Sequence, residues 1–323
     1  MPQLNRPLGN SGLLVSPVAL GCWPIAGMTS LDVTERDSQA TIEAAIAAGI
    51  NFLDTAWCYG SDGDSERLIG RTIQGRREQL VIATKCGIHW GPQGERIFDA
   101  SRARIHRECR ESLQRLQIEQ IDLYYLHAPD PNIPLAESAA AIAELHAQGL
   151  IRAAAVSNVT VAQLQEFQAV CPVAAVQPPY NMLQRQIETD LVPYCREHNI
   201  ALCIYWPLLK GLLAGKLPRD HVFRLGDGRP KYPMFQGEEW QRNQDLLDDL
   251  RAIAADSNKT VAQLVVQWTL AQPGITAALC GAKRPEQIIE SAAALADDFT
   301  TAELTKINAA LARRGPAVTR SAV

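Results

Sequence analysis

Short apolar runs alternate with amphipathic stretches along most of the chain. The runs are rich in branched residues, and they are VALGC (18–22), FLDTA (52–56), LVIATKC (80–86), IDLYYLH (121–127), AAAVSN (153–158), VAAVQ (173–177), ALCIYW (201–206) and AALCGA (277–282). Runs that are apolar on both faces indicate strands buried on both sides, and their alternation with helical patterns indicates a parallel sheet covered by helices.

The segments between these runs carry helix signals. ATIEAAIAAG ends at Gly49, which is placed as a C-terminal cap, and TVAQLQEFQ begins at Thr160, which is placed as an N-cap. Eight strand and helix units favour an α/β fold that closes into a (β/α)₈ TIM barrel over an open sheet. An open nucleotide-binding sheet would be expected to show GxGxxG after its first strand, and this sequence has no such match. GLLAGK (211–216) is one residue short of a Walker motif.

Two segments fall outside the eightfold pattern, within what we expect to be a single barrel domain over residues 1–323. Residues 1–16 surround the turn sequence GNSG and predict an N-terminal β-hairpin that plugs the bottom of the barrel. Residues 209–240 predict a long loop after strand 7, and a loop of this length is often a lid over a cofactor or substrate. One hypothesis is that Met234 and Phe235 close over the substrate.

Composition and charge narrow the class of protein. The 323 residues are 47% hydrophobic and 20% charged with a net charge of −4, which is typical of a soluble globular protein and not of a nucleic-acid binder or a membrane-surface protein. No apolar segment approaches the ~18 residues of a membrane span. LLVSPVALGC (13–22) resembles a lipoprotein signal, but Pro17 interrupts it, so a barrel strand is favoured. The 8 cysteines show no CxxC, which favours free thiols in the cytoplasm over disulfides or a metal site.

Polar side chains stand where successive strands end, which in such a barrel is the face that carries the chemistry. The second strand ends at Asp54 with Tyr59 in the loop behind it, the third at Lys85 and the fourth at His127. Taken singly, each of these is more often a helix cap, a solvated charge or a packing residue. Four of them at adjacent strand ends are hard to explain by packing, because burying an unpaired charge is costly.

These four residue types suit the reduction of a carbonyl group. A free tyrosine hydroxyl has a pKa of ~10, and a neighbouring ammonium is expected to lower that pKa. Tyr59 would act as the acid, Lys85 would tune it, Asp54 would hold Lys85, and His127 would donate a hydrogen bond to the carbonyl oxygen.

Six segments resemble the aldo-keto reductase superfamily, the group that includes bacterial sugar-aldehyde reductases, aldose dehydrogenases and the β subunits of potassium channels. FLDTAWCYG is similar to DTAxxYG, and the other segments are ATKCG, IDLYYLHAPD, GLIRAAAVSN, YWPLLKGLLAGK and GAKRPEQIIESA. The resemblance implies a catalytic tetrad of Asp54, Tyr59, Lys85 and His127. This sequence departs from the family pattern at four positions, Ala155, Pro178, Trp206 and Ser291, where the family commonly has Gly, Asn, Ser and Asn, respectively.

The resemblance also implies a nicotinamide cofactor. The residues expected to bind it are Ser157, Asn158, Gln177, Tyr205, Trp206, Pro207, Leu208, Lys210, Gly211, Leu213, Gly281, Lys283, Gln287 and Ser291. Tyr205 would stack on the nicotinamide ring. Lys283 and Arg284 could pair with a 2′-phosphate, which favours NADP(H) with NAD(H) as the alternative. An exposed basic helix start is an equally good interpretation of these two residues.

Three tryptophans follow strand ends and are candidates for the substrate pocket. Trp23, Trp57 and Trp90 could form an aromatic wall for a sugar or an aryl aldehyde, although each could equally be a packing residue. The expected partner is therefore a small carbonyl compound or sugar, with no nucleic acid, membrane or metal, and the oligomeric state is open.

The favoured function is an NADP(H)-dependent reductase that interconverts an aldehyde or ketone and its alcohol by direct hydride transfer. The same tetrad would serve an aldose 1-dehydrogenase that runs oxidatively. A cofactor-binding, redox-sensing regulatory subunit is a third alternative. The presence of all four tetrad residues argues against a barrel that has lost its chemistry.

Overall fold

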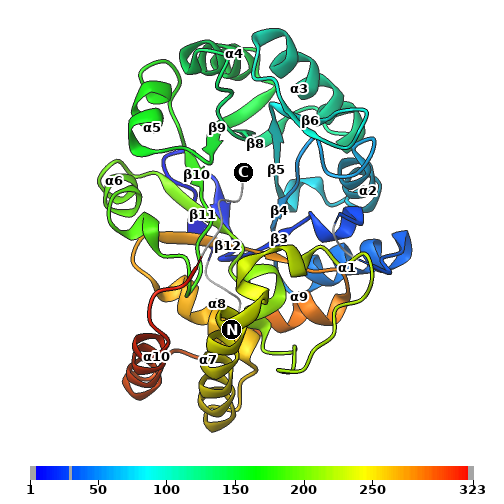
Figure 1. Cartoon of the computed structure of the whole chain (residues 1–323). Coiled ribbons are helices and arrows are strands. Elements are labelled where there is room, and N and C mark those ends of the chain that lie inside the picture. Colours follow the sequence, from blue (N-terminus) through cyan, green and yellow to red (C-terminus); the bar gives the residue numbers. More distant parts are fainter. Residues whose placement is uncertain (1–4, 29–30, 319–323) are drawn as a thin grey trace.

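The computed structural model describes residues 5–28 and 31–318, and its centre is a closed barrel of eight parallel strands surrounded by helices (Figure 1). The barrel strands follow one another in chain order and are β3 (Val18–Gly21), β4 (Phe52–Asp54), β5 (Val81–Cys86), β8 (Ile121–Leu126), β9 (Ile151–Ser157), β10 (Ala175–Gln177), β11 (Ala201–Tyr205) and β12 (Ile275–Gly281). Each lies within or overlaps one of the eight apolar runs, which confirms the (β/α)₈ prediction.

The strands are buried on both faces, as their composition predicts. All six residues of β5 and all six of β8 are buried. Inside the barrel, small residues such as Ala83 and Ala155 surround Phe52 and Tyr125, while branched residues on the outer face pack against the helices. Because side chains fill the interior of the barrel, the space for a site lies at its open end, where the strands terminate.

The N-terminal hairpin pairs β1 (Arg6–Pro7) with β2 (Leu14–Val15) in antiparallel register. Its apolar residues Leu8, Leu13 and Val15 are buried against the residues that fill the barrel interior, so the described part of the hairpin closes one end. Residues 1–4 of the predicted hairpin lie outside the described residues.

Among the residues that the structure describes, eight α-helices cover the barrel, and two more lie outside the repeating pattern (Figure 1). The covering helices are α1 (Glu35–Ala47), α2 (Asp64–Thr72), α3 (Arg102–Leu116), α4 (Leu135–Ala147), α5 (Val161–Gln168), α6 (Leu191–Glu197), α8 (Val261–Ala271) and α9 (Pro285–Ala292), and the additional ones are α7 (Gly237–Asp256) and α10 (Thr301–Arg314). Thr160 caps α5 in a capping box, as predicted. Gly49 follows the end of α1 with φ 85°, a conformation that favours glycine.

The segment after β11 is ordered by short 3₁₀ turns, η4 (Leu209–Ala214), η5 (Arg229–Lys231) and η6 (Pro233–Phe235), before α7 begins. Met234 and Phe235 are buried at its end, and the Phe235 ring packs at 5.6 Å from Phe223 and 6.1 Å from Trp240. The hypothesis that these two residues close over the substrate is therefore wrong, because they form the packing that anchors the loop to α7.

A second small hairpin, which the periodicity did not predict, follows β5. Strands β6 (Ile88–Trp90) and β7 (Arg96–Phe98) pair in antiparallel register and form a two-stranded sheet separate from the barrel. Glu108 of α3 anchors the start of this hairpin, because its Oε2 accepts a 2.7 Å hydrogen bond from the Gly87 amide.

Within the described ranges, no helix is both long and apolar enough to cross a membrane, and no cluster of side chains is arranged to hold a metal ion. All eight cysteines are buried free thiols.

Candidate active site

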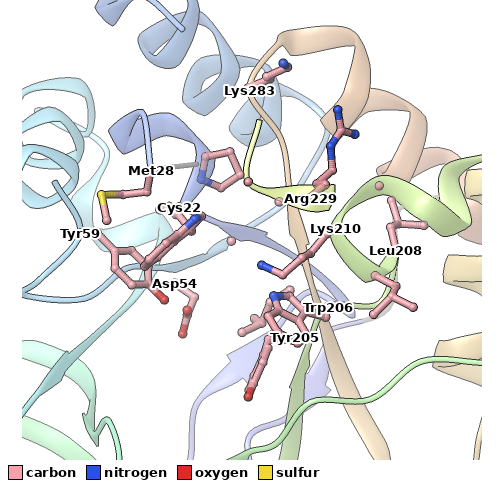
Figure 2. A pocket seen from close by; sticks show the side chains of 18 of the residues that line it. Cys22, Met28, Asp54, Tyr59, Tyr205, Trp206, Leu208, Lys210, Arg229 and Lys283 are labelled. Carbon is pink, nitrogen blue, oxygen red and sulfur yellow. The ribbon is translucent and has the colours of Figure 1, made fainter. Parts of the chain in front are cut away.

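A cavity of about 630 Å³ opens at the carboxyl ends of the barrel strands. The residues that line it include Asp54, Tyr59, His127, Tyr205, Trp206 and Lys210. Figure 2 shows Tyr59 and Asp54 facing the cavity across from Tyr205, Trp206 and Lys210, with Arg229 and Lys283 toward one end. The parallel strands deliver these side chains to one mouth because all of their carboxyl ends meet there.

Asp54 and Lys85 form a buried ion pair beneath the cavity. Lys85 Nζ lies 2.5 Å from Asp54 Oδ1 and 2.7 Å from the carbonyl oxygen of Thr55, and the two side chains are only 1% and 3% exposed. Gln177 Nε2 donates to Asp54 Oδ2 at 2.8 Å, so both carboxylate oxygens are bound. Burial raises the pKa of Asp54, and the Lys85 ammonium opposes that rise. Because Lys85 and Asp54 each have a further hydrogen-bond partner, the ion pair is fixed in position.

Tyr59 is brought over this pair by the turn that follows β4. The turn is closed by a hydrogen bond from the Tyr59 amide to the Ala56 carbonyl at 3.1 Å, and Gly60 follows with φ 97°. The Trp23 ring packs edge-on at 5.0 Å from the Tyr59 ring, and Lys85 Nζ lies 5.1 Å from the ring centre. The structure thus brings Tyr59 close to Lys85, as the sequence predicted.

The electrostatics of Tyr59 differ from the prediction. Burial, followed by the negative charge of Asp54, raises the pKa of Tyr59 well above its ordinary value, whereas the sequence argument expected Lys85 to lower it. The reason is that Lys85 directs its ammonium at Asp54 and at the Thr55 carbonyl, so the pair as a whole presents little net positive charge to the phenol. Tyr59 is therefore a neutral hydroxyl that keeps its proton.

His127 lies beside Tyr59 with a ring separation of 6.0 Å. Burial, together with the charges of Lys85 and Arg96, holds the pKa of His127 well below its usual range, so the imidazole is neutral. Its Nδ1 lies 3.7 Å from the sulfur of Cys58. A neutral imidazole has one N–H, and with Tyr59 it can present two hydrogen-bond donors to one oxygen atom in the cavity.

Between His127 and Tyr205, a chain of hydrogen bonds links the residues predicted to hold a nicotinamide. Tyr205 donates to Asn158 Oδ1 at 2.8 Å, and Asn158 Nδ2 donates to the His127 carbonyl at 2.9 Å. Ser157 Oγ donates to the Gln177 carbonyl at 2.8 Å. All four predicted residues line the cavity, and this network holds the flat face of Tyr205 in place.

The segment after β11 carries a lysine across the cavity between two aromatic rings. Lys210 Nζ lies 4.4 Å from the ring centres of both Trp206 and Tyr232, and burial lowers the pKa of Lys210. Trp206 and Lys210 both have positive φ, at 62° and 56°, so the backbone turns sharply here. The remaining predicted residues in the lining are Pro207, Leu208, Gly211, Gly281, Lys283 and Gln287.

Several predicted residues are not brought to the cavity. Leu213 is buried in the core, and the Ser291 hydroxyl donates to the Gln287 carbonyl within its own helix at 3.1 Å. Arg284 pairs with Asp37 at 3.2 Å and does not line the cavity, because α1 provides a carboxylate closer to it. Of the basic pair, only Lys283 lies in the wall.

Two of the three tryptophans line the cavity, and the prediction for Trp57 is wrong. Trp23 and Trp90 are in the wall. Trp57 instead packs outward against α3, where Arg104 and Arg115 lie 4.8 Å from its ring and its Nε1 donates to Glu111 at 2.7 Å. The position of Trp57 after a strand end suggested that its ring would face the cavity. The ring instead faces α3, because three charged side chains of that helix contact it.

Sequence reasoning missed cavity residues that reach the site from segments other than the barrel strands. Met28 follows β3, Arg96 comes from the β6–β7 hairpin, and Asp227, Arg229 and Tyr232 come from the loop after η4. A signal was present for Arg96, because the turn sequence WGPQGE lies between two short runs and is typical of a hairpin.

Comparison with known proteins agrees with this geometry. The family model described as "Aldo/keto reductase family" matches residues 17–312. The aldo-keto reductase YhdN of Bacillus subtilis is 38% identical over 285 residues, covering 87% of this chain and 85% of that one, and the NADH-specific methylglyoxal reductase of Escherichia coli is 34% identical over 315 residues, covering 93% and 95%. The solved structure of a glycerol dehydrogenase from Gluconobacter oxydans superposes with a TM-score of 0.89 at 34% identity, covering 100% of this chain and 99% of that one. The chain therefore belongs to the aldo/keto reductase family.

Proposed function

We propose that this protein is an NADP(H)-dependent aldo-keto reductase that interconverts an aldehyde or ketone and its alcohol, with Tyr59 as the general acid and base. The observation that carries the proposal is the pairing of two neutral donors, Tyr59 and His127, above the buried Asp54–Lys85 ion pair at the wall of one cavity. Family membership supports an oxidoreductase that acts on carbonyl and alcohol groups.

The tetrad would act on the carbonyl oxygen. The neutral His127 donates a hydrogen bond that polarises the carbonyl, and the Tyr59 hydroxyl gives its proton to the oxygen as the alcohol forms. The phenolate that remains lies close to Lys85, whose Nζ is 5.1 Å from the ring centre, and because the pKa of Tyr59 is raised it readily takes up a proton again. In the reverse direction the same phenolate accepts the proton of the alcohol.

The part of the wall around Tyr205 fits a nicotinamide cofactor. Ser157, Asn158 and Gln177 line the cavity together with Tyr205, and their polar groups suit the carboxamide of a nicotinamide while the Tyr205 ring suits its flat face. When bound, the reduced nicotinamide supplies the hydride to the carbonyl carbon. Asn158 fixes the orientation of Tyr205 through a 2.8 Å hydrogen bond, so its role includes positioning that ring.

The cationic end of the cavity supports binding of the cofactor phosphates. Lys210, Arg229, Lys231 and Lys283 line this end, and Asp227 binds Arg229 at 2.6 Å. Lys283 is the residue proposed to meet a 2′-phosphate, which favours NADPH. The relative named as NADH-specific makes NADH the alternative, and Lys283→Ala distinguishes the two because it should weaken NADPH binding and leave NADH binding unchanged.

The oxidative direction is a second candidate because the superposed structure is that of a glycerol dehydrogenase. A cavity wall of Trp23 and Trp90 suits the carbon skeleton of a polyol as well as that of an aldehyde.

The test follows the absorbance of the reduced cofactor with both NADPH and NADH. The protein is given an aryl aldehyde or methylglyoxal in one direction, and glycerol with NADP⁺ in the other. Turnover in either direction supports the proposal and identifies the preferred one. Tight binding of cofactor without turnover of any of these compounds would contradict it.

A further inference from the structure

The amine of Lys210 lies in the cavity between two aromatic rings. Its Nζ is 4.4 Å from the ring centres of both Trp206 and Tyr232, and all three residues line the cavity. Figure 2 shows the Lys210 nitrogen directed into the open space of the cavity. A small molecule that enters the cavity can therefore reach this nitrogen, while the two rings shield the side chain from water.

The backbone holds Lys210 in this position. Its φ of 56° lies in the left-handed region, between Leu209 at 41° and Gly211 at 86°. The Leu209 amide donates to the Trp206 carbonyl at 2.9 Å, and Asn181 Nδ2 donates to the same carbonyl at 3.2 Å. A fixed turn thus presents the amine to the cavity.

Most lysines of this chain are held by carboxylates. Four of the seven form ion pairs, Lys85 with Asp54, Lys216 with Glu290, Lys259 with Glu303 and Lys306 with Asp256. The other three, Lys210, Lys231 and Lys283, all line the cavity and pair with no carboxylate in the part of the chain that the structure describes. An ammonium without a carboxylate beside it gives up its proton more readily.

Among these three lysines, Lys210 is the one whose surroundings favour a neutral amine. Lys231 is exposed, and Lys283 Nζ donates to the Leu31 carbonyl at 3.5 Å. Burial lowers the pKa of Lys210 against an opposing effect of Tyr232, and the charge of Lys231, whose Nζ lies 5.7 Å from the same Tyr232 ring, lowers it further. A desolvated lysine next to another cation is an environment that activates the amine as a nucleophile.

We propose that Lys210 forms a Schiff base with small aldehydes that enter the cavity when no cofactor is bound, and that this adduct blocks the cofactor site. The amine nitrogen attacks the carbonyl carbon, a proton passes from nitrogen to oxygen, and the resulting carbinolamine loses one water to give the C=N bond. No oxidant or reductant is needed, and addition of water reverses the step. The inference rests on the proposed function, because that function brings carbonyl compounds and cofactor to this cavity.

The adduct makes aldehyde and cofactor compete for the same space. An aldehyde joined to Lys210 lies beside Trp206, and the Schiff base removes a positive charge from the end of the cavity that is proposed to bind the cofactor phosphates. Excess aldehyde should therefore slow the enzyme by competing with the cofactor, and bound cofactor should protect Lys210.

The experiment maps the adduct without measuring turnover. Native protein is incubated with benzaldehyde and sodium cyanoborohydride, which reduces the imine to a stable benzylamine, and peptide mass spectrometry measures the labelled fraction of each lysine. At pH 7, Lys210 should be labelled severalfold faster than the exposed Lys231 and Lys306, because a lower pKa leaves a larger neutral fraction. That ratio should fall as the pH rises towards the pKa of an ordinary lysine.

Protection by cofactor locates the adduct in the cavity. NADP⁺ at ten times its dissociation constant should slow the labelling of Lys210 about tenfold, because it leaves about a tenth of the protein unoccupied. Labelling of Lys306, which lies on α10 outside the cavity wall, should not change. NADP⁺ is used because it protects the site without reducing the aldehyde.

Variants test the surroundings of the amine. Trp206→Ala removes one of the two rings and admits water, so it should bring the labelling rate of Lys210 down towards that of Lys231. In Lys210→Met, benzaldehyde should no longer weaken the binding of NADP⁺. Lys216→Met is the matched control, because Lys216 belongs to the same segment but binds Glu290 outside the cavity wall, and it should leave the labelling of Lys210 unchanged.

The inference and the proposed function fail separately. Labelling of Lys210 that is no faster than that of Lys231, or that is equal with and without NADP⁺, would overturn the inference. Turnover of aldehydes by a protein that carries no label at Lys210 rejects the inference alone. Label at Lys210 in a protein that turns over no aldehyde keeps the inference and rejects the reductase.

Discussion

The ion pair of Lys85 and Asp54 is buried, so its contribution to stability depends on how the two charges are satisfied. Removing two charges from water is expensive, and the attraction between them offsets this only when their remaining hydrogen-bonding capacity is also satisfied. Here Thr55 and Gln177 supply those additional bonds. The same ion pair therefore contributes to the stability of the barrel mouth and positions the groups that are proposed to act in catalysis.

Replacing Lys85 with Met should destabilise the protein by about 3–5 kcal/mol at neutral pH, because it leaves the Asp54 carboxylate buried and unpaired. Urea unfolding followed by circular dichroism measures this loss. The double variant Asp54→Asn/Lys85→Met removes the stranded charge and should recover a large part of the stability. Equal stability of the single and double variants would show that the charge of Asp54 is not the cause.

Sequence reasoning at the residue scale placed the ion pair and the neighbouring Tyr59 and His127 together, because strand ends of a parallel barrel converge. It failed for the pKa of Tyr59. The direction of that shift depends on how deeply the hydroxyl is buried and on which atoms receive the Lys85 ammonium, and neither quantity is encoded in spacing along the chain.

Helix α3 organises one side of the site through charged contacts. Arg104 and Arg115 hold the ring of Trp57, and Glu108 binds both Arg104, at 2.6 Å, and the first amide of the β6–β7 hairpin. The strand-end position of Trp57 suggested a pocket residue, but side-chain direction is decided by partners far away in sequence. The hairpin was missed because its strands are only three residues long.

Trp57→Ala and Trp90→Ala form a matched pair that tests these different environments. Trp57→Ala should lower the free energy of unfolding by roughly 2 kcal/mol, because it removes two cation–π contacts and a hydrogen bond to Glu111. It should leave the KM values of a carbonyl panel unchanged, whereas Trp90→Ala should raise them. A change in KM for Trp57→Ala that matches the change for Trp90→Ala would return Trp57 to the pocket.

Glu108 should make the stability of the protein depend on pH. Burial raises the pKa of Glu108 from 4.5 to about 7, so between these values the folded state holds a proton that the unfolded state has released. Stability should therefore fall as pH rises through this window, by up to about 3 kcal/mol.

Urea unfolding at pH 5 and pH 8 measures that fall, and Glu108→Gln should reduce it. Glu137→Gln, at an exposed position of α4, is the matched control and should keep it. The same pH dependence in Glu108→Gln and in the native protein would assign the effect to other groups.

The barrel as a whole could be predicted from the sequence because its eight strands are continuous apolar runs. Such runs suit strands that are buried on both faces and few other environments. The segments that complete the cavity are different in kind. The loop between β11 and α7 contributes Asp227, Arg229 and Tyr232, and their positions depend on packing of Phe223 and Phe235 against Trp240. Such long-range packing has no periodic signal in the sequence, so the positions of the residues at the proposed cofactor end of the cavity could be predicted only in part.

The most direct test of the account replaces the phenol that is proposed to give and take the proton. Turnover of an aryl aldehyde with NADPH is compared in the native protein, in Tyr59→Phe and in Tyr194→Phe, whose hydroxyl binds Gln168 away from the cavity. General acid catalysis contributes ~10²–10⁴-fold, so Tyr59→Phe should lose activity on that scale while still binding NADPH, and Tyr194→Phe should keep it. Near-native turnover by Tyr59→Phe would contradict the mechanism.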